Sequence, residues 1–259
     1  MSRLRFTTAH LTHPGMVREA NEDSVGHFPD EASWIVADGM GGHSSGQVAS
    51  QMAVEYIADF MSRWRRQTDF IWPFDVDSGL SYAERCLVNA IRVANVRIYN
   101  RAQVDDSCES MGTTIVMAHY DESEGMAIAH VGDSRCYRWR AHQLVQLTDD
   151  HSLAREMSRI MHVTEEDAQA QVGSHIILRA LGTEDDVEVD VQIDAPQAGD
   201  VYLLCSDGLS DMLDDAMISQ ILTGALINPE TATEALIEGA NDAGGLDNIS
   251  ALVITVSED

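Results

Sequence analysis

The chain has 259 residues, of which 43 are acidic and 16 are basic, and its formal net charge is −27. Every basic residue is an arginine. Contacts with nucleic-acid phosphates or anionic lipids need cations, so this composition argues against nucleic-acid binding and against docking on a membrane. The absence of lysine excludes a Schiff-base enzyme and a Walker-type nucleotide loop.

The rest of the composition is that of a folded protein, which we expect to form one domain over residues 1–259. Hydrophobic residues make up 44% of the chain, without repeats or low-complexity linkers. None of the four cysteines forms a Cys-x-x-Cys pair, which argues against a zinc knuckle. The N-terminal segment lacks the apolar stretch of a signal peptide, and no apolar run approaches the ~18 residues of a membrane span. We therefore expect a cytoplasmic protein with reduced thiols.

Short apolar segments predict strands, and apolar residues repeating every three or four positions predict helices. Ser81 and Glu84 form a capping box at the start of one helix. In chain order, we expect a short strand after Asp23, a strand at 34–37, helices at about 45–66 and 81–98, strands at 113–118, 126–131, 136–139, 144–147, 187–193 and 201–205, helices at about 214–224 and 228–244, and a strand at 249–256. Two helix pairs among neighbouring antiparallel strands predict a layered α+β sandwich rather than a parallel α/β sheet.

The segment that joins the first two helices, 67–79, is rich in aromatic residues. It contains Phe70, Ile71, Trp72 and Phe74. We favour a loop whose rings pack over the helix ends, and the alternative is an exposed patch that binds a partner.

Acidic residues stand where predicted strands begin or end. Any one of them is explained by a turn, because Asp and Gly commonly end strands. Strands of packed sheets bring their ends to common edges, however, and several carboxylates held together need a cation. Oxygen-only ligand sets favour Mg²⁺ or Mn²⁺ over zinc. The residues concerned are Glu22, Asp23, Asp38, Asp133, Asp207 and Asp247.

Two such ions side by side are a known means of activating water and holding a phosphoryl group. Gly39, directly after Asp38, allows a backbone carbonyl to approach a metal as well. Arg18 lies four residues before Glu22 and is a candidate for binding a phosphate, because a guanidinium matches phosphate oxygens bidentately. A surface arginine without a ligand is the alternative interpretation.

Eight motifs then follow one another in the order of a known family. They are Gly15-x-x-Arg18-x-x-Asn21-Glu22-Asp23, Val36-Ala37-Asp38-Gly39-Met40-Gly41-Gly42-His43, Met111-Gly112-Thr113-Thr114, His130-Val131-Gly132-Asp133-Ser134-Arg135, Leu147-Thr148-Asp149-Asp150-His151-Ser152, Arg179-Ala180-Leu181-Gly182, Leu203-Leu204-Cys205-Ser206-Asp207-Gly208-Leu209-Ser210-Asp211 and Asp247-Asn248-Ile249-Ser250. The chain thus resembles the metal-dependent protein phosphatases of type 2C, in their bacterial single-domain form, from about residue 7 to residue 256.

The resemblance implies a four-layer α+β sandwich, with two packed antiparallel sheets flanked by pairs of α-helices. It implies hydrolysis of phosphoserine and phosphothreonine in proteins, through a dinuclear Mn²⁺ or Mg²⁺ centre and a metal-activated water. The implied metal residues are Asp38, which bridges two ions; Asp207 and Asp247 on one ion; the Gly39 carbonyl on the other; Glu22 and Asp23 near the ions or their waters; and Asp133 with Asp207 for a third, weaker ion.

Two further roles follow from the resemblance. Arg18 would bind the phosphate, and His43 is our candidate for the acid that protonates the departing serine or threonine oxygen. Eukaryotic members place a histidine directly after Asp-Gly, where this chain has Met40. His43 can therefore position the substrate instead, with a metal-bound water as the proton donor.

Residues 153–177 correspond to the variable flap beside the active site of the family. Loops beside a fixed site commonly carry specificity. Arg155 and Arg159 are candidates for contacting the residues that flank the phosphorylated one, although we favour a solvated helix face.

The expected partners are phosphorylated proteins, the substrates of a cognate bacterial Ser/Thr kinase, and that kinase itself. We expect a monomer. Three other readings compete with a phosphatase. A binding module that has lost catalysis would lack Asp38, Asp207 or Asp247, and all three are present. A phosphatase for anti-anti-sigma regulators would usually carry an attached sensor domain, and a calcium-binding protein would cluster its ligands in one loop.

Overall fold

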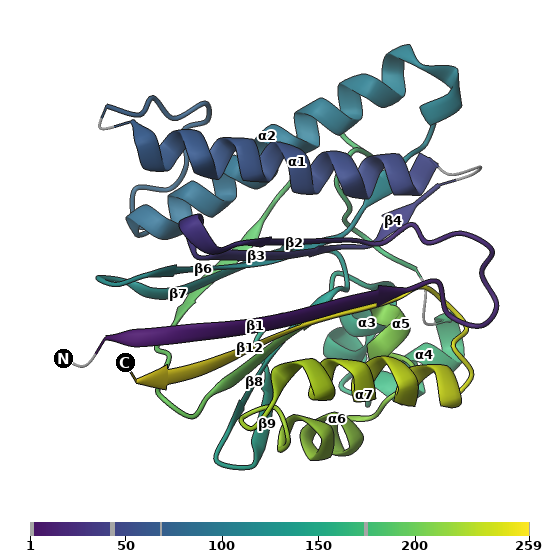
Figure 1. Ribbon diagram of the computed structural model, residues 1–259. Coiled ribbons are helices and arrows are strands. Elements are labelled where there is room, and N and C mark those ends of the chain that lie inside the picture. Colours follow the sequence, from purple (N-terminus) through teal and green to yellow (C-terminus); the bar gives the residue numbers. More distant parts are fainter. Residues whose placement is uncertain (1–2, 42–44, 68, 174–175, 259) are drawn as a thin grey trace.

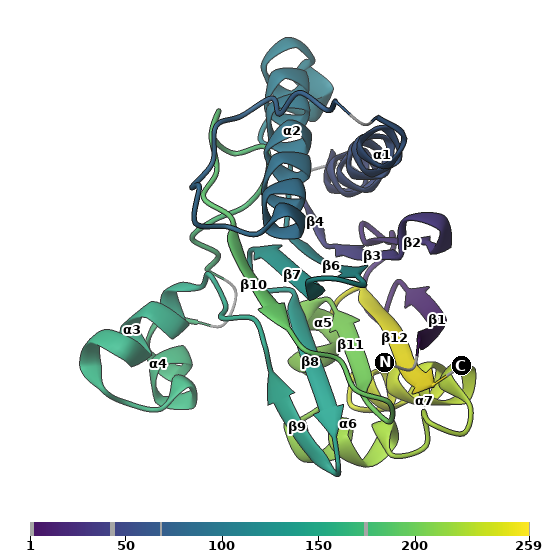
Figure 2. The same ribbon diagram turned by 90° about the vertical axis from the view of Figure 1, so that its left-hand side faces the viewer.

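The computed structural model describes residues 3–41, 45–67, 69–173 and 176–258. Two five-stranded antiparallel sheets face each other, and a pair of helices covers the outer face of each sheet (Figures 1 and 2). The structure thus confirms the predicted four-layer α+β sandwich.

The first sheet has the strand order β10-β7-β6-β3-β2 and lies beneath α1 and α2 (Figure 1). Its elements are β2 (Ser24–Phe28), β3 (Ser33–Ala37), β6 (Ile115–Asp121), β7 (Gly125–Val131), β10 (Asp190–Asp194), α1 (Ser45–Arg66) and α2 (Tyr82–Val104). A two-stranded sheet of β4 (Gly39–Met40) and β5 (Gly112–Thr113) extends it beside α1.

The second sheet has the strand order β1-β12-β11-β8-β9 and lies above α6 and α7 in Figure 1. Its elements are β1 (Leu4–His13), β8 (Arg135–Arg140), β9 (Gln143–Gln146), β11 (Val201–Cys205), β12 (Ile249–Glu258), the short α5 (Asp207–Ser210), α6 (Asp215–Leu222) and α7 (Pro229–Asp242). The flap helices α3 (Leu153–Met161) and α4 (Glu165–Val172) project sideways from the sandwich (Figure 2). Short 3₁₀ turns at Pro29–Glu31 and Asp106–Cys108 complete the elements.

Three apolar layers hold the sandwich together, and the alternation of side chains along each strand assigns residues to them. In β3, Ile35 packs beneath α1 and α2, whereas Trp34 and Val36 pack between the two sheets. In β12, Leu252 joins the layer between the sheets, and Val253 points toward α6 and α7. Central strands are therefore buried on both faces, which explains their continuous apolar sequences.

Strand β1 is absent from the sequence-based prediction, although it pairs with β12 over its whole length, from Leu4 opposite Glu258 to His13 opposite Ile249. Leu4 and Phe6 are half-buried and alternate with the exposed Arg5. A strand at the edge of a sheet buries few side chains, so its apolar signal is weak.

The predicted strand at 187–193 begins only at Asp190. Its partner β7 ends at Val131, opposite residue 189, so the residues before Asp190 have few partners for a ladder. Val187 and Val189 pack instead against the layer beneath α1 and α2.

The structure also supports the packing interpretation of the loop 67–79. Phe70 contacts Phe60 edge-to-face at 5.2 Å, and Trp72 contacts Tyr82 at 5.3 Å between ring centroids. Ile71 alone among these large apolar side chains is strongly exposed. The aromatic residues therefore fasten the loop to the ends of α1 and α2.

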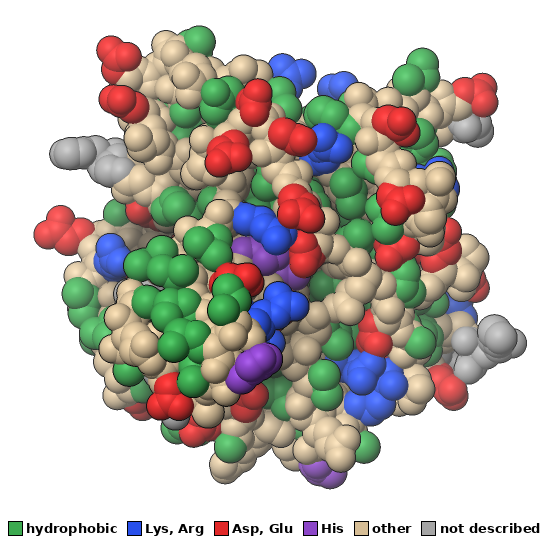
Figure 3. Space-filling model, turned by 180° about the vertical axis from the view of Figure 1, so that it is seen from behind, with side chains coloured by type: hydrophobic (Ala, Val, Ile, Leu, Met, Phe, Trp, Pro, Cys, Tyr) green, Lys and Arg blue, Asp and Glu red, His purple; other side chains and the backbone are tan. Residues whose placement is uncertain are grey.

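The acidic side chains on the face seen in Figure 3 are dispersed among neutral residues and arginines, and they do not form one continuous patch. Within the described part of the chain, no helix has the length and apolar character that crossing a bilayer requires.

The N-terminus of α2 is held by two carboxylates. Ser81 and Glu84 form the predicted capping box. Glu124, in the β6–β7 hairpin, accepts hydrogen bonds from the backbone N–H groups of Tyr82 and Ala83 at 3.0 and 2.7 Å. This contact joins α2 to the sheet beneath it.

We expect Glu124→Ala to lower the free energy of unfolding by about 1–2 kcal/mol, because it leaves two N–H groups at a helix N-terminus without their anion. Urea denaturation measures this loss. Glu122→Ala, an exposed change in the same hairpin, is the control. Equal losses in the two variants would contradict the assignment of a cap.

Candidate metal centre

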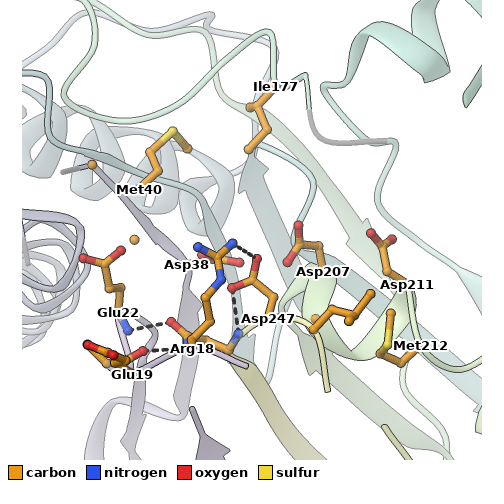
Figure 4. A pocket seen from close by; sticks show the side chains of 16 residues that line it. Arg18, Glu19, Glu22, Asp38, Met40, Ile177, Asp207, Asp211, Met212 and Asp247 are labelled. Atoms are coloured by element: carbon orange, nitrogen blue, oxygen red, sulfur yellow. Dashed lines mark hydrogen bonds and ion pairs between the residues drawn. The ribbon is translucent and has the colours of Figure 1, made fainter. Parts of the chain in front are cut away.

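The loops at one end of the sandwich surround a cavity of about 490 Å³ (Figure 4). Both sheets contribute to it, because β3 leads into it from the first sheet, and the segments that follow β11 and precede β12 border it from the second. Its charged lining consists of one arginine, Arg18, and the six acids Glu19, Glu22, Asp38, Asp207, Asp211 and Asp247. The strand-end acids thus converge, with the exceptions described below.

Backbone hydrogen bonds fix Asp38 at the end of β3. Its carbonyl accepts from the Thr113 hydroxyl and from the Thr114 N–H, both at 2.8 Å. Its own N–H donates to the Thr114 hydroxyl at 3.1 Å. These three bonds tie β3 to the neighbouring strand and direct the carboxylate into the cavity (Figure 4).

Gly39 follows, where any side chain would collide with the backbone. A Cβ atom there would lie 2.1 Å from the Gly46 carbonyl oxygen and 2.5 Å from that of Glu22. The first turn of α1 and the loop with Glu22 can therefore close around β4 only if position 39 is glycine.

Asn248 joins the N-terminal loop to the strand that follows Asp247. Its amide nitrogen donates to the carbonyls of Pro14 and Ala20 at 3.0 and 2.8 Å, and its amide oxygen accepts the Glu22 N–H at 2.7 Å. This one side chain holds the segment that carries Arg18 and Glu22 against the cavity. We did not assign it a role from sequence, since an Asp-Asn pair gives no sign of the distant loop.

Asp23 does not line the cavity but lies buried behind it. Its Oδ2 accepts from the hydroxyls of Ser206 and Ser250 at 2.9 and 2.7 Å, whereas its Oδ1 has no hydrogen-bond partner. Burial raises the pKa of Asp23 to about 7. The two serines come from the ends of β11 and β12, so Asp23 also ties the first sheet to the second.

Asp133, after β7, borders a second and smaller cavity with Asp207, Asp150 and Asp211. Arg135 binds Asp150 at 2.6 Å and so balances that charge. The buried Oδ1 of Asp133 has no partner, and burial, followed by the charge of Asp207, raises the pKa of Asp133 to about 8. Asp207 borders both cavities and links the two groups of acids.

Asp211 ends the seventh of the sequence motifs, but it has no role among the sequence-based predictions. It lies one helical turn after Asp207 and borders both cavities, with its N–H bonded to the Asp207 carbonyl at 2.8 Å. The spacing of four residues within Ser-Asp-Gly-Leu-Ser-Asp could have revealed it, had a helix been predicted there.

Several acidic side chains lie close together in this region, and their mutual repulsion disfavours the ionised forms. Burial raises the pKa of Asp38 well above its ordinary value, and the charges of Asp23 and Asp207 raise it further. The arrangement fits a hard divalent cation, because buried carboxylate oxygens without hydrogen-bond donors are the ligands that Mg²⁺ and Mn²⁺ prefer.

Arg18 supplies positive charge at the mouth of the cavity. Its guanidinium contacts Asp247 at 2.7 Å and lies near Asp38 in Figure 4, and its side chain is 56% exposed. The hydrogen bond with Asp247 raises the pKa of Arg18. The structure thus brings Arg18 together with the acids, as its spacing from Glu22 suggested.

Two other candidates from sequence do not enter the cavity. Arg155 and Arg159, in α3, contact the two oxygens of Asp149 at 2.5 and 3.2 Å. These contacts support the interpretation of a solvated helix face that is fastened to the base of the flap. His43 lies outside the described residues.

A second cluster of ligand-type side chains consists of His130, His151 and Asp190. It is the one trio among the described residues whose candidate ligand atoms lie within 4.8 Å of one another. The Arg179 guanidinium already occupies this place, 2.9 Å from Asp190 Oδ1 and 3.4 Å from His151 Nε2. Burial lowers the pKa of His151 to about 4, so its ring is neutral. This cluster is a structural brace, and the described acids of the main cavity form no trio as compact as this one.

A sandwich of two antiparallel sheets with an acid-lined cavity at one end is the architecture of the metal-dependent phosphatases, and comparison with known proteins agrees. The sequence profile of the family Protein phosphatase 2C matches residues 17–237. The serine/threonine phosphatase stp of Listeria monocytogenes is 39% identical over 246 residues, which cover 94% of this chain and 93% of that protein.

Solved structures give the same result. The serine/threonine phosphatase PstP/Ppp of Mycobacterium tuberculosis superimposes with a TM-score of 0.83 at 31% identity, covering 98% of this chain and 99% of that one. The catalytic domain of PstP in complex with two manganese ions gives a TM-score of 0.80 at 32% identity, covering 99% and 100%. The chain belongs to the protein phosphatase 2C family, and it is a metal-dependent protein serine/threonine phosphatase.

We expect the metal-free protein to lose stability as the pH rises from about 5 to about 8, by at least about 1 kcal/mol. Burial places the pKa of Asp23 at about 7 and that of Asp133 at about 8, whereas an aspartate of the unfolded chain titrates near ~4. Between these values the folded state binds more protons than the unfolded state, so raising the pH favours unfolding.

Urea denaturation in chelator at several pH values measures this slope. Asp133→Asn should flatten it, and Mn²⁺ should abolish most of it by neutralising the carboxylates. A metal-free protein that became more stable between pH 5 and pH 8 would contradict this account.

Proposed function

We propose that the acid-lined cavity hydrolyses phosphoserine and phosphothreonine at a centre of two Mn²⁺ or Mg²⁺ ions, with a third ion held more weakly. The observation that carries this proposal is the presence of buried carboxylate oxygens on Asp23 and Asp133 that lack any donor, beside a cavity with six acids and one arginine. The manganese-bound structure of PstP supports it.

The residues of this chain would divide between the ions as the resemblance to the family implies. Asp38, which follows β3 and lines the cavity, would bridge the ions, with Asp207 and Asp247 on one and the Gly39 carbonyl on the other. Glu22 and Asp23 would hold the ions or their waters, and Asp133 would hold the third ion with Asp207. When bound, the ions lower the pKa of a water and neutralise phosphoryl charge.

Arg18 has a separate task. One of its nitrogens contacts Asp247, and the planar guanidinium has further N–H groups for the oxygens of a phosphate. As a permanent cation it can stabilise the charge that builds on the phosphoryl oxygens in the transition state. Asp247 would thus orient Arg18 and also bind one of the ions.

Protonation of the departing oxygen needs a donor. Of the described residues that line the cavity, none is a histidine. We keep His43 as the candidate acid, with a water on the metal as the alternative. His43→Gln should lower kcat for a phosphopeptide more than for an aryl phosphate, because the leaving group of an aryl phosphate needs no proton.

The substrates follow from the activity. They are phosphorylated proteins, and we propose that a cognate Ser/Thr kinase produces them and is itself a substrate. The monomeric state and the cytoplasmic location stay predictions.

The central test is phosphate release from phosphothreonine peptides with Mn²⁺, with chelator, and in Asp38→Asn and Asp207→Asn. We expect chelator to abolish turnover and each variant to lower kcat/KM by about 100-fold or more, because each removes a charged ligand from the centre. Asp30→Asn, an exposed change at a residue that does not line the cavity, is the control. Turnover without metal would refute the proposed centre.

We expect Arg18→Ala to lower kcat/KM by about 10- to 100-fold, because the variant loses a charge-assisted hydrogen bond to the phosphate. Arg18→Lys should recover part of the loss, since it restores the charge but not the planar fork. Steady-state kinetics on the same peptides measure both, with Arg66→Ala at the end of α1 as the control. An unchanged kcat/KM in Arg18→Ala would assign this residue to the surface only.

A further inference from the structure

Apolar side chains form two walls on opposite sides of the carboxylates in the cavity. Met40 and Ile177 lie on one side of Asp38 and Asp207, and Met212 lies on the other (Figure 4). Leu246 lines the cavity as well. A metal site of carboxylates needs no such side chains. Met212 also packs against the apolar layer that faces α6 and α7, and its remaining surface lines the cavity.

The second wall, formed by Met212 and Leu246, is shaped by the turn at Gly244 and Gly245. A Cβ atom at Gly244 would lie 3.8 Å from Leu246 Cγ and 3.9 Å from Met212 Sδ, which places those two side chains around the same turn. The Met16 N–H donates to the Gly245 carbonyl at 2.7 Å. Both glycines have positive φ angles, +135° and +54°, which L side chains rarely adopt, so glycine is favoured at both positions of the turn.

Exposed apolar surface continues from this wall. Leu246, which lines the cavity, is 59% exposed, and Met16 and Val17, which lie outside the lining, are 67% and 62% exposed. Such a group at the edge of a charged cavity is typical of a binding surface. Because these side chains adjoin the cavity, the segment that would lie against them is the substrate chain on either side of the phosphorylated residue.

The charges around the cavity restrict that occupant further. Glu19 and Asp211 line it beside the acids that serve the metals, and Arg18 is the one cation among its described lining residues. An acidic side chain next to the phosphorylated residue would therefore meet like charge, whereas an apolar one would contact the two walls.

We propose that these walls select substrates in which apolar residues flank the phosphoserine or phosphothreonine, and that the cavity disfavours acidic flanks. This inference rests on the proposed function, because it takes the cavity as the place where the phosphorylated side chain binds. Met212 and Leu246 are then residues that determine specificity.

The test uses capped phosphothreonine peptides of equal length whose neighbours on both sides are Leu, Ser, Lys or Asp, together with capped phosphothreonine alone. We measure kcat/KM with Mn²⁺ at about 0.05 M and about 0.5 M salt. The Leu peptide should exceed the Ser peptide about tenfold at both salt concentrations, because apolar contact is not screened. The Asp peptide should fall below Ser at low salt and approach it at high salt.

The variants Met212→Gln and Leu246→Gln keep the length of the side chain nearly unchanged, and each should reduce the Leu/Ser ratio several-fold. Met217→Gln is the matched control, since this methionine is 49% exposed on α6 and does not line the cavity. Each ratio compares two substrates of one preparation, so partial unfolding does not affect it.

Equal kcat/KM for Leu and Ser peptides, a preference for Lys alone that disappears at high salt, or a ratio that the two variants leave unchanged would overturn the inference. Failure of the proposed function looks different, because neither capped phosphothreonine nor any peptide would then be turned over.

Discussion

The structure depends on the repulsion among carboxylates that the fold forces together. Asp23 and Asp133 are buried, and Asp38 is half-buried at the cavity. The charge of Asp207 raises the pKa of all three. Such a group of like charges is unfavourable for folding and favourable for holding cations. The backbone bonds of Thr113 and Thr114 and the serine hydroxyls around Asp23 keep these side chains in place despite that cost.

The site exists only when the two sheets are packed together. Asp38 comes from the first sheet, whereas Asp207 and Asp247 come from the second, and the apolar layer between the sheets fixes their separation. Asn248 and Asp23 add polar ties across the same boundary. The packing that stabilises the sandwich therefore also sets the geometry of the proposed metal centre.

The large negative charge and the cavity play different parts. On the face seen in Figure 3 the acidic residues are dispersed, and their charges act at long range and are weakened by salt. Close to the reacting group, short-range contacts with the side chains of the two walls would distinguish one peptide segment from another. These side chains are Met40, Ile177, Met212 and Leu246. The surface thus affects which proteins approach, and the walls affect which peptide segment fits.

The sequence alone determined most of the order of the elements, the α+β class and the convergence of most strand-end acids, because buried strands, capping boxes and Asp-Gly turns are local patterns. It missed β1, whose side chains are half-exposed at an edge. It also gave no role to Asp211 or to Asn248, and the contacts of Asn248 are with distant segments. It also could not show that Asp23 lies behind the cavity, or that Arg155 and Arg159 bind Asp149. These facts are set by the packing of one sheet on the other, which decides the direction of each side chain and is not a property of any single segment.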